Sequence, residues 1–208
     1  MLILSFDTCL DKTYVVLRKD SEIIDSRVIL SDSDNYHSAY LITTISKVLN
    51  DNGYLPKDID GISIDVGPGS FTGIRACTTV ARTMAQQLGI KGLTVSSLEI
   101  LSEIDKSAIV VLDARKNSAY VWDKELIGVK PIEEVKELVK DRLVITDKNL
   151  YEVLIPTART VIKYEEGNYE LGRFLSNITE RKLSEFQDWN ELKPLYIQPP
   201  SISVKKGN

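Results

Sequence analysis

Histidine is almost absent from the 208-residue sequence, in which His37 is the only one. One histidine cannot build a two-histidine metal site, and the HExxH pattern of zinc enzymes is absent. A Ser-His-Asp triad would have to use His37, yet no serine lies in the GxSxG setting of a hydrolase nucleophile. We therefore expect His37 to be a surface or interface residue, and we expect neither a metal site nor a protease-like centre.

Cysteine is also scarce, because Cys9 and Cys77 are the only two and they form no CxxC pair. Both lie in apolar stretches, which predicts reduced, buried side chains used for packing. The first residues, MLILSFDTCLDK, lack a basic segment, and Asp7 interrupts their apolar run. We expect no signal peptide, no membrane span and a cytoplasmic location.

Positive charge is in deficit, since the formal net charge is −4. Non-specific affinity for nucleic acid comes mainly from Lys and Arg that neutralise phosphates. Any contact with RNA should therefore be local, or made indirectly through a partner. The segment 201–208 and the two prolines just before it predict a loose tail.

Hydrophobic periodicity in the first half predicts an α/β lobe. The expected elements are strands within 2–8, 13–18, 22–30, 61–66 and 92–97 and helices over 35–50, 72–88 and 96–104. The first three strands should form an antiparallel meander. The first helix should be capped by Ser33 or Asp34, the second should end at Gly89, and the third should begin at a serine cap.

The second half repeats this theme in reduced form. It offers a hairpin over 108–123, a helix over 131–140 with proline in its first turn, strands over 143–147 and 159–164, and a helix over 168–182. The boundary should lie near residues 96–106. We therefore expect one lobe over residues 1–100, a smaller lobe over 101–200 and the tail.

Two segments carry polar groups at expected strand ends. Asp7 and Thr8 follow the first strand, at the edge where open sheets place ligand-facing groups; turn chemistry is the alternative. The GPGSFTG loop, residues 67–73, is neither a Walker loop nor a dinucleotide fingerprint. It could hold an anion at the helix amino terminus, or it could be a turn capped by Ser70 or Thr72. The candidate residues are Asp7, Thr8, Gly67, Gly69, Ser70 and Gly73.

Several motifs together resemble the TsaB (YeaZ) family. They are IDVGPGSFTGIRACTTVARTMAQQLGI and VSSLEIL, with ILSFDT, HSAYLITTISKVL, LDARKNSAYVW and PLYIQ. The resemblance covers essentially the whole chain. It implies an actin/Hsp70/sugar-kinase-like (ASKHA) α/β fold of two lobes, each built on a mixed five-stranded sheet with helices.

The resemblance also implies a function. Proteins of this family form homodimers and pair with a related catalytic subunit, TsaD, and with the ATPase TsaE. Together they transfer a threonylcarbamoyl group to the adenosine beside the tRNA anticodon. The chain would be a non-catalytic scaffold that meets tRNA indirectly through the complex. We expect no tightly bound cofactor, and ATP or ADP only within the TsaD/TsaE complex.

Departures from the family pattern bear on this expectation. TsaD-like enzymes hold a metal through an HxxxH pair, and here the second position is Leu41. Cys9 replaces the usual serine, and the glycine of nucleotide-binding relatives is missing from this first turn. Gln198 replaces a usual arginine near the end.

The family's interface helices correspond to residues 35–50 and 72–88. The candidate interface residues are His37, Leu41, Ile45, Ile74, Thr78 and Arg82, and the sequence leaves open which stripe faces a partner. The alternative function is a self-sufficient ATP-dependent transferase or kinase that uses Asp7, Thr8 and the 67–73 loop.

Overall fold

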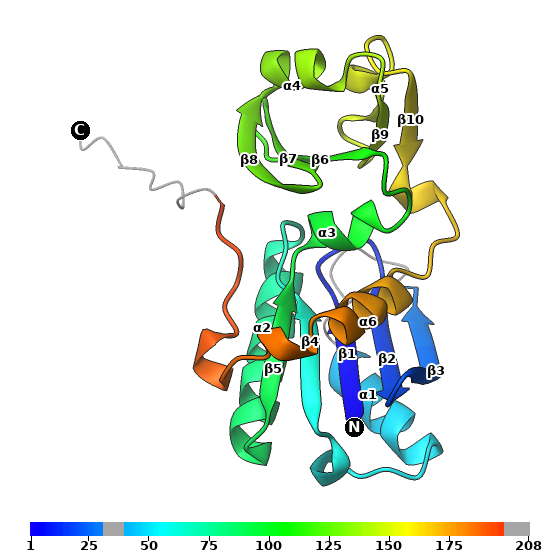
Figure 1. Cartoon of the computed structure of the whole chain (residues 1–208), viewed down its shortest axis with the longest axis vertical. Coiled ribbons are helices and arrows are strands. Elements are labelled where there is room, and N and C mark those ends of the chain that lie inside the picture. Colours follow the sequence, from blue (N-terminus) through cyan, green and yellow to red (C-terminus); the bar gives the residue numbers. More distant parts are fainter. Residues whose placement is uncertain (31–39, 198–208) are drawn as a thin grey trace, which may run out of the picture.

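The computed structural model describes residues 1–30 and 40–197, which form two lobes (Figure 1). The sheet of the first lobe has the order β3-β2-β1-β4-β5. Its strands are β1 (Leu2–Asp7), β2 (Thr13–Lys19), β3 (Glu22–Ile29), β4 (Gly61–Asp65) and β5 (Lys91–Val95). The first three form the predicted antiparallel meander, and β4 and β5 run parallel to β1.

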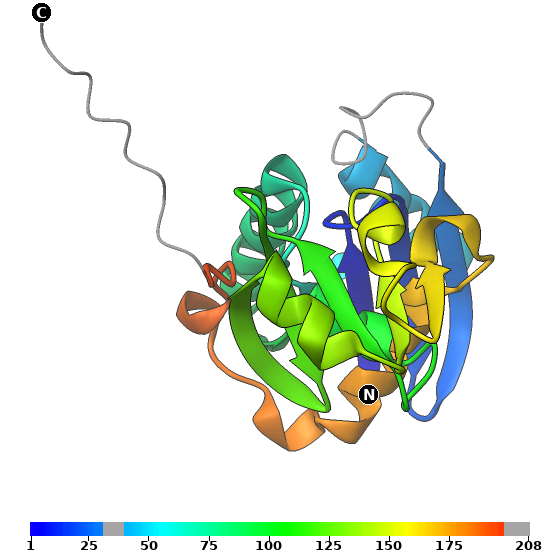
Figure 2. The same cartoon turned by 90° about the horizontal axis from the view of Figure 1, so that it is seen from above.

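Helices cover both faces of this sheet, as Figure 2 shows. On one face lie α1 (Leu41–Asp51) and α2 (Phe71–Leu88), and on the other lies α6 (Leu171–Arg181). Strand β1 is therefore buried along its whole length, which explains its nearly unbroken apolar sequence. The expected start of the first helix at residue 35 and its caps lie outside the described residues.

Helix α2 confirms the predicted apolar stripe, because Ile74, Cys77 and Ala81 are buried against the sheet. It ends where predicted, at Gly89, which adopts a left-handed conformation with φ of 65°. Helix α3 (Ser97–Ser102) begins at the expected serine cap, since the Ser96 hydroxyl accepts a hydrogen bond from the Glu99 N–H at 3.1 Å.

The second lobe repeats the connectivity of the first, with the sheet order β10-β9-β6-β7-β8. Its strands are β6 (Ile109–Asp113), β7 (Ser118–Asp123), β8 (Glu125–Pro131), β9 (Leu143–Thr146) and β10 (Thr160–Lys163). Three antiparallel strands are again followed by two strands parallel to the first of them. The reduced repetition inferred from the order of elements is confirmed.

Two elements of this lobe were missed from the sequence. Strand β8 has exposed Leu126 and Ile127 and a register shift beside Gly128, whose φ is 109°, so its residues do not alternate cleanly. Helix α5 (Tyr151–Leu154) is too short to show helical periodicity. The predicted helix at 131–140 starts one residue later, because Pro131 ends β8 and caps α4 (Ile132–Val139).

The lobes share a hydrophobic core. Leu98 and Leu101 of α3 belong to the same buried cluster as Val110 of β6 and Leu175 of α6. On the outer face of the second sheet, α4 and α5 cover a separate cluster. Short 3₁₀ turns complete the chain at Pro56–Asp58, Tyr164–Glu166, Leu183–Glu185 and Trp189–Glu191. Among the described residues, no helix has both the length and the apolar character needed to cross a membrane.

After β10 the chain returns to the first lobe, which corrects the predicted second lobe of residues 101–200. Helix α6 packs against the first sheet (Figure 1). Leu192 is fully buried in the first-lobe core. The amphipathic pattern of residues 168–182 predicted a helix correctly. It could not show which sheet the helix covers, because any apolar sheet face satisfies the same pattern.

A buried arginine fastens α6 to the first sheet. Arg18 of β2 is 2% exposed, and its guanidinium donates hydrogen bonds to Ser176 at 3.0 Å, Asn177 at 2.6 Å and Glu180 at 2.8 Å. A fourth bond reaches the Ser21 carbonyl at 2.8 Å. Because this buried charge on β2 has three partners on α6, it stabilises one placement of the helix against the sheet.

Replacing Arg18 with methionine should therefore lower the free energy of unfolding by about 3 kcal/mol, because polar groups of α6 lose their buried partner. Urea denaturation measures this change. Lys19→Met, at the exposed neighbouring position, should stay within about 0.5 kcal/mol of the wild type. Equal stability of the two variants would contradict the assigned role of Arg18.

Candidate functional site

The carboxyl ends of β1 and β4 lie side by side and carry two aspartates. Asp7 ends β1 and Asp65 ends β4, and the two strands pair in parallel. Asp7 is 1% exposed and Asp65 is completely buried. Sequence reasoning singled out Asp7 and missed Asp65, although the rule that ligand-facing groups gather at the carboxyl ends of strands applies equally to both.

Backbone N–H groups of the GPGSFTG loop donate to protein oxygens. The Gly67 N–H donates to Asp65 Oδ1 at 2.7 Å, and the Ser70 N–H donates to the Cys9 carbonyl at 2.7 Å. The Gly73 N–H donates to the Ser70 hydroxyl at 3.2 Å, so Ser70 is the helix cap of the two candidates. Three N–H groups that could bind an anion thus already have acceptors within the protein. This favours the interpretation of the loop as a capped turn over that of an anion site.

Close backbone contact explains the glycines of this loop. A Cβ at Gly73 would overlap the Thr8 carbonyl oxygen, and one at Gly69 would overlap the Cys9 carbonyl oxygen. The Thr8 hydroxyl donates to the Gly73 carbonyl at 2.7 Å. The turn after β1 therefore lies directly against the amino end of α2, and only glycine permits that approach.

The Asp7–Asp65 pair retains one proton at neutral pH. Burial raises the pKa of Asp65 to about 6, although hydrogen bonds from Ser97 and Gly67 oppose the shift. Burial also raises the pKa of Asp7 well above its ordinary value, and the nearby charge of Asp65 raises it further. Two adjacent buried carboxyl groups cannot both ionise easily, so we assign a proton to Asp7 at neutral pH.

Acidic groups also gather where the lobes face each other. Burial is the main cause that raises the pKa of Asp147, and the charge of Asp113 raises it further. Burial is also the main cause that raises the pKa of Glu165, to which the charges of Asp147 and Asp11 add. Burial likewise raises the pKa of Tyr164, and the charges of Glu165, Asp11 and Asp147 raise it further. The carboxyl groups of Asp113, Asp147, Glu165 and Asp11 therefore lie close enough to act on one another at the junction of the lobes.

A pocket of about 310 Å³ lies beside α3 and α6. It is lined by Glu99, Ser102, Glu103, Lys106, Ala108, Trp122, Lys124 and Arg181. Lys106 and Arg181 both pair with Glu103. Most of the positive charge in its wall is thus already neutralised within the protein.

The predicted interface residues fall mainly inside the core. Leu41, Ile45, Ile74 and Thr78 are at most 7% exposed, and they pack towards the first sheet, not towards solvent. Arg82 lies over the ring of Trp189, 5.5 Å from its centroid. His37 lies outside the described residues. Helical periodicity identified the stripe, but it could not distinguish a stripe that faces the sheet from one that faces a partner.

Exposed residues of the same two helices form a different stripe. Ile42 of α1 is 65% exposed and Phe71 of α2 is 57% exposed, and Tyr40 just before α1 is 52% exposed. Arg75 lies 3.9 Å from the centroid of the Phe71 ring. Both helices cover the same face of the sheet, so their outer sides point the same way (Figure 2).

The two related sheets, with helices on their outer faces and a shared core between them, define an ASKHA-like α/β fold, as expected. A solved structure of YeaZ from Pseudomonas aeruginosa superposes with a TM-score of 0.73 at 21% identity, covering 94% of this chain and 99% of that one. A second Pseudomonas aeruginosa structure, with similarity to peptidase YeaZ, gives 0.75 at 21% identity over 95% and 99% of the chains.

Sequence comparisons define the family. The sequence model of the family described as TsaD, tRNA N6-adenosine threonylcarbamoyltransferase, matches residues 27–173. The TsaB protein of Bacillus subtilis is 32% identical over 124 residues, which are 58% of this chain and 53% of the relative. That of Buchnera aphidicola subsp. Schizaphis graminum is 28% identical over 211 residues, covering 84% and 98%. The chain therefore belongs to this family, within its TsaB (YeaZ) group.

The glycine contact can be tested by replacing Gly73 with alanine. The added methyl group would overlap the Thr8 carbonyl, so we expect the free energy of unfolding to fall by about 3 kcal/mol or more. Thr72→Ala, at the exposed preceding position, should change it by less than about 0.5 kcal/mol. Urea denaturation measures the free energy of unfolding of both variants. If Gly73→Ala is as stable as the wild type, the close approach of Gly73 to Thr8 is excluded.

Glu165 provides a pH test of the acidic junction. The Lys148 N–H donates to its Oε1 at 3.0 Å, whereas its buried Oε2 has no hydrogen-bond partner among the described residues. Because folding raises the pKa of this carboxyl above the ordinary 4.5, the stability of the wild type falls as pH rises from 4.5 through the folded pKa. Glutamine keeps the acceptor and does not titrate.

We expect Glu165→Gln to be about 1 kcal/mol more stable than the wild type at pH 8 and no more stable at pH 4. Urea denaturation at the two pH values measures the difference. Glu166→Gln, at the exposed neighbouring position, is the matched control and should give no gain at pH 8. A gain for Glu165→Gln that is equal at both pH values would refute the electrostatic cause.

Proposed function

We propose that this chain acts in the synthesis of threonylcarbamoyladenosine in tRNA. In this proposal it is a non-catalytic subunit that binds a TsaD-like catalytic subunit and supports threonylcarbamoyl transfer to the adenosine beside the anticodon. The observation that carries the proposal is the membership of the TsaB group, whose curated relatives are named tRNA threonylcarbamoyladenosine biosynthesis proteins.

Three features support the non-catalytic part. The position that would complete an HxxxH metal pair is Leu41, a residue fully buried in the first-lobe core. Asp7, the leading candidate for chemistry, holds a proton beside Asp65. N–H groups of the 67–73 loop donate to protein oxygens. These groups maintain the fold and leave little at this edge to activate a substrate.

The same chemistry disfavours the alternative of a self-sufficient ATP-dependent transferase or kinase. A triphosphate between the lobes would approach Asp113, Asp147 and Glu165; burial raises the pKa of Asp147, and the charge of Asp113 raises it further. Like charges at short range cost free energy, and the N–H groups of Gly67, Ser70 and Gly73 in the loop predicted for phosphate already have protein acceptors. In this proposal ATP or ADP binds only within a complex that contains TsaD-like and TsaE-like subunits, and tRNA is met through them in the cytoplasm.

The partner surface that we propose is the outer side of α1 and α2, which we call the α1–α2 face. It consists of Tyr40, Ile42, Phe71, Thr72, Arg75, Thr79, Thr83 and Gln86, all exposed. Large apolar side chains stand beside short uncharged ones, and Arg75 is the one charged residue among these eight; Lys47 of α1 is also exposed. A face of this composition suits a protein interface, where charges are depleted and aromatic groups and arginine are enriched. In the isolated chain the same face would form a homodimer.

A negative charge at the middle of the α1–α2 face tests this assignment. Thr79 is exposed, so Thr79→Glu should leave stability unchanged but weaken binding to the TsaD-like subunit of the same organism by about tenfold or more, because the carboxylate would be desolvated in the interface. Isothermal titration calorimetry measures the affinity. Thr160→Glu, at the exposed first residue of β10, carries the same change away from this face and should bind normally.

Reconstitution of tRNA modification, with each protein left out in turn, tests the function itself. Modification should require this chain together with the TsaD-like and TsaE-like proteins. Turnover by the isolated chain with ATP and magnesium would contradict the non-catalytic role. Unchanged affinity of Thr79→Glu would instead reject only the location of the interface.

A further inference from the structure

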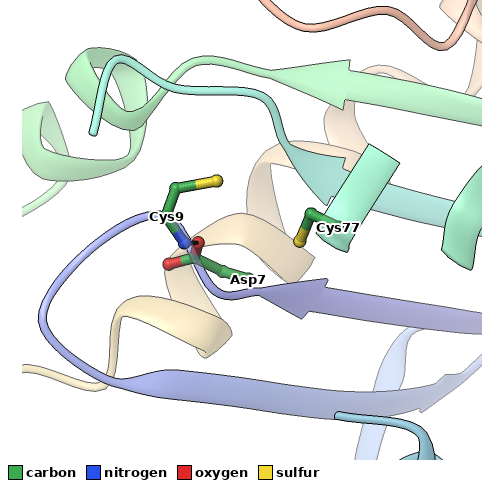
Figure 3. Close-up of side chains that lie close together, drawn as sticks. All are labelled: Asp7, Cys9 and Cys77. Carbon is green, nitrogen blue, oxygen red and sulfur yellow. Dashed lines mark hydrogen bonds between the residues drawn. The ribbon is translucent and has the colours of Figure 1, made fainter. Parts of the chain in front are cut away.

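Two cysteines that lie 68 positions apart in the sequence meet beside Asp7 (Figure 3). The carboxylate oxygen of Asp7 and the sulfurs of Cys9 and Cys77 all lie within 4.8 Å of one another. All three residues are at most 1% exposed. We propose that Asp7, Cys9 and Cys77 form a buried site for a zinc ion that fastens the turn after β1 to α2.

The fold places these three donors together before any ion binds. Asp7 ends β1, Cys9 lies two residues later, and Cys77 faces them from α2. The approach of Gly73 to Thr8 holds the turn against the helix. The ligands of an ion at this point would therefore come from the turn after β1 and from α2, which are already in contact through their backbones.

The distances suit a small metal ion. Three atoms no more than 4.8 Å apart share a central point within about 2.8 Å of each. Zinc bonds to sulfur are about 2.3 Å long and zinc bonds to carboxylate oxygen about 2.0–2.2 Å. A shift of roughly half an ångström by each side chain would reach these lengths. Two thiolates and one carboxylate favour zinc over magnesium or calcium, which prefer oxygen ligands alone.

One of the oxygen atoms that could bind the ion lacks a hydrogen bond within the described part of the chain. Asp7 Oδ2 is buried and has no hydrogen-bond partner among the described residues. The thiols donate weak hydrogen bonds to backbone oxygens, from Cys9 to the Asp65 carbonyl at 3.3 Å and from Cys77 to the Phe6 carbonyl at 3.6 Å. A buried polar atom without a partner costs free energy, and coordination would remove that cost.

Charge balance fixes the proton count. Zinc would replace the protons of both thiols and of the Asp7 carboxyl, so up to three protons leave for each ion bound, and the ligands and ion together carry a charge of −1. The three ligand residues are at most 1% exposed, so the ion would be enclosed, and its fourth tetrahedral position would be left to a water molecule or a nearby backbone carbonyl oxygen such as that of Asp65. Its role would be to stabilise the β1–α2 junction, independently of the proposed partner role.

The full-length protein, reduced with a phosphine and desalted, is titrated with cobalt(II) as a spectroscopic probe and then with zinc. We expect a thiolate-to-cobalt charge-transfer band that saturates at one ion per chain and disappears when zinc is added. Because Cys9 and Cys77 are the only cysteines, the band reports on them alone. Zinc at roughly 100 times its dissociation constant should raise the thermal midpoint by about 5 °C.

The variants separate the site from adventitious binding. Cys77→Ala keeps a small buried side chain and should lose both the band and the zinc-dependent rise. Thr78→Ser, at the adjacent buried position, should retain both. The wild-type titration is decisive even if Cys77→Ala is unstable: a reduced protein that gives no thiolate band overturns the proposal, and so does a band that is unchanged in Cys77→Ala.

Discussion

The close contact between the turn after β1 and the amino end of α2 supports the organisation of the first lobe. The carbonyl oxygens of Thr8 and Cys9 lie where side chains of Gly73 and Gly69 would be, and the Thr8 hydroxyl and Ser70 N–H bridge the two segments. This contact buries Asp7 beside Asp65, aligns α2 along the sheet and brings Cys77 to Cys9. The glycine-rich loop is thus explained by backbone approach before any ligand is considered.

The two lobes share one connectivity, but the last helix, α6, packs on the sheet of the first. In both, a three-stranded meander is followed by two parallel strands. The last helix, α6, crosses back to the first sheet, where Arg18 and the chain of hydroxyl bonds from Thr179 through Ser63 to Ser5 hold it. Because α6 and α3 share a core with the second sheet, the lobes are coupled by packing as well as by the chain.

This arrangement agrees with a supporting role. Residues at the sheet edge that could do chemistry are mostly buried and bonded to their neighbours, whereas the outer side of α1 and α2 leaves Ile42 and Phe71 exposed. Exposing large apolar side chains to water costs free energy, so burying them against a protein partner would be favourable. The zinc site that we propose would stiffen the junction beneath this face without taking part in catalysis.

The sequence by itself determined the order of most strands and helices, the serine cap of α3, the stop at Gly89 and the family, because local periodicity, capping residues and the GPGSFTGIR block are carried by neighbouring residues. It missed β8, where Gly128 breaks the alternation, and it assigned α6 to the wrong lobe. Only the tertiary structure decided that Ile74 and Thr78 face the sheet, that Asp7 pairs with Asp65, and that Cys9 meets Cys77. Each of these depends on which distant segments pack together, and amphipathic patterns specify that a face is buried without specifying what buries it.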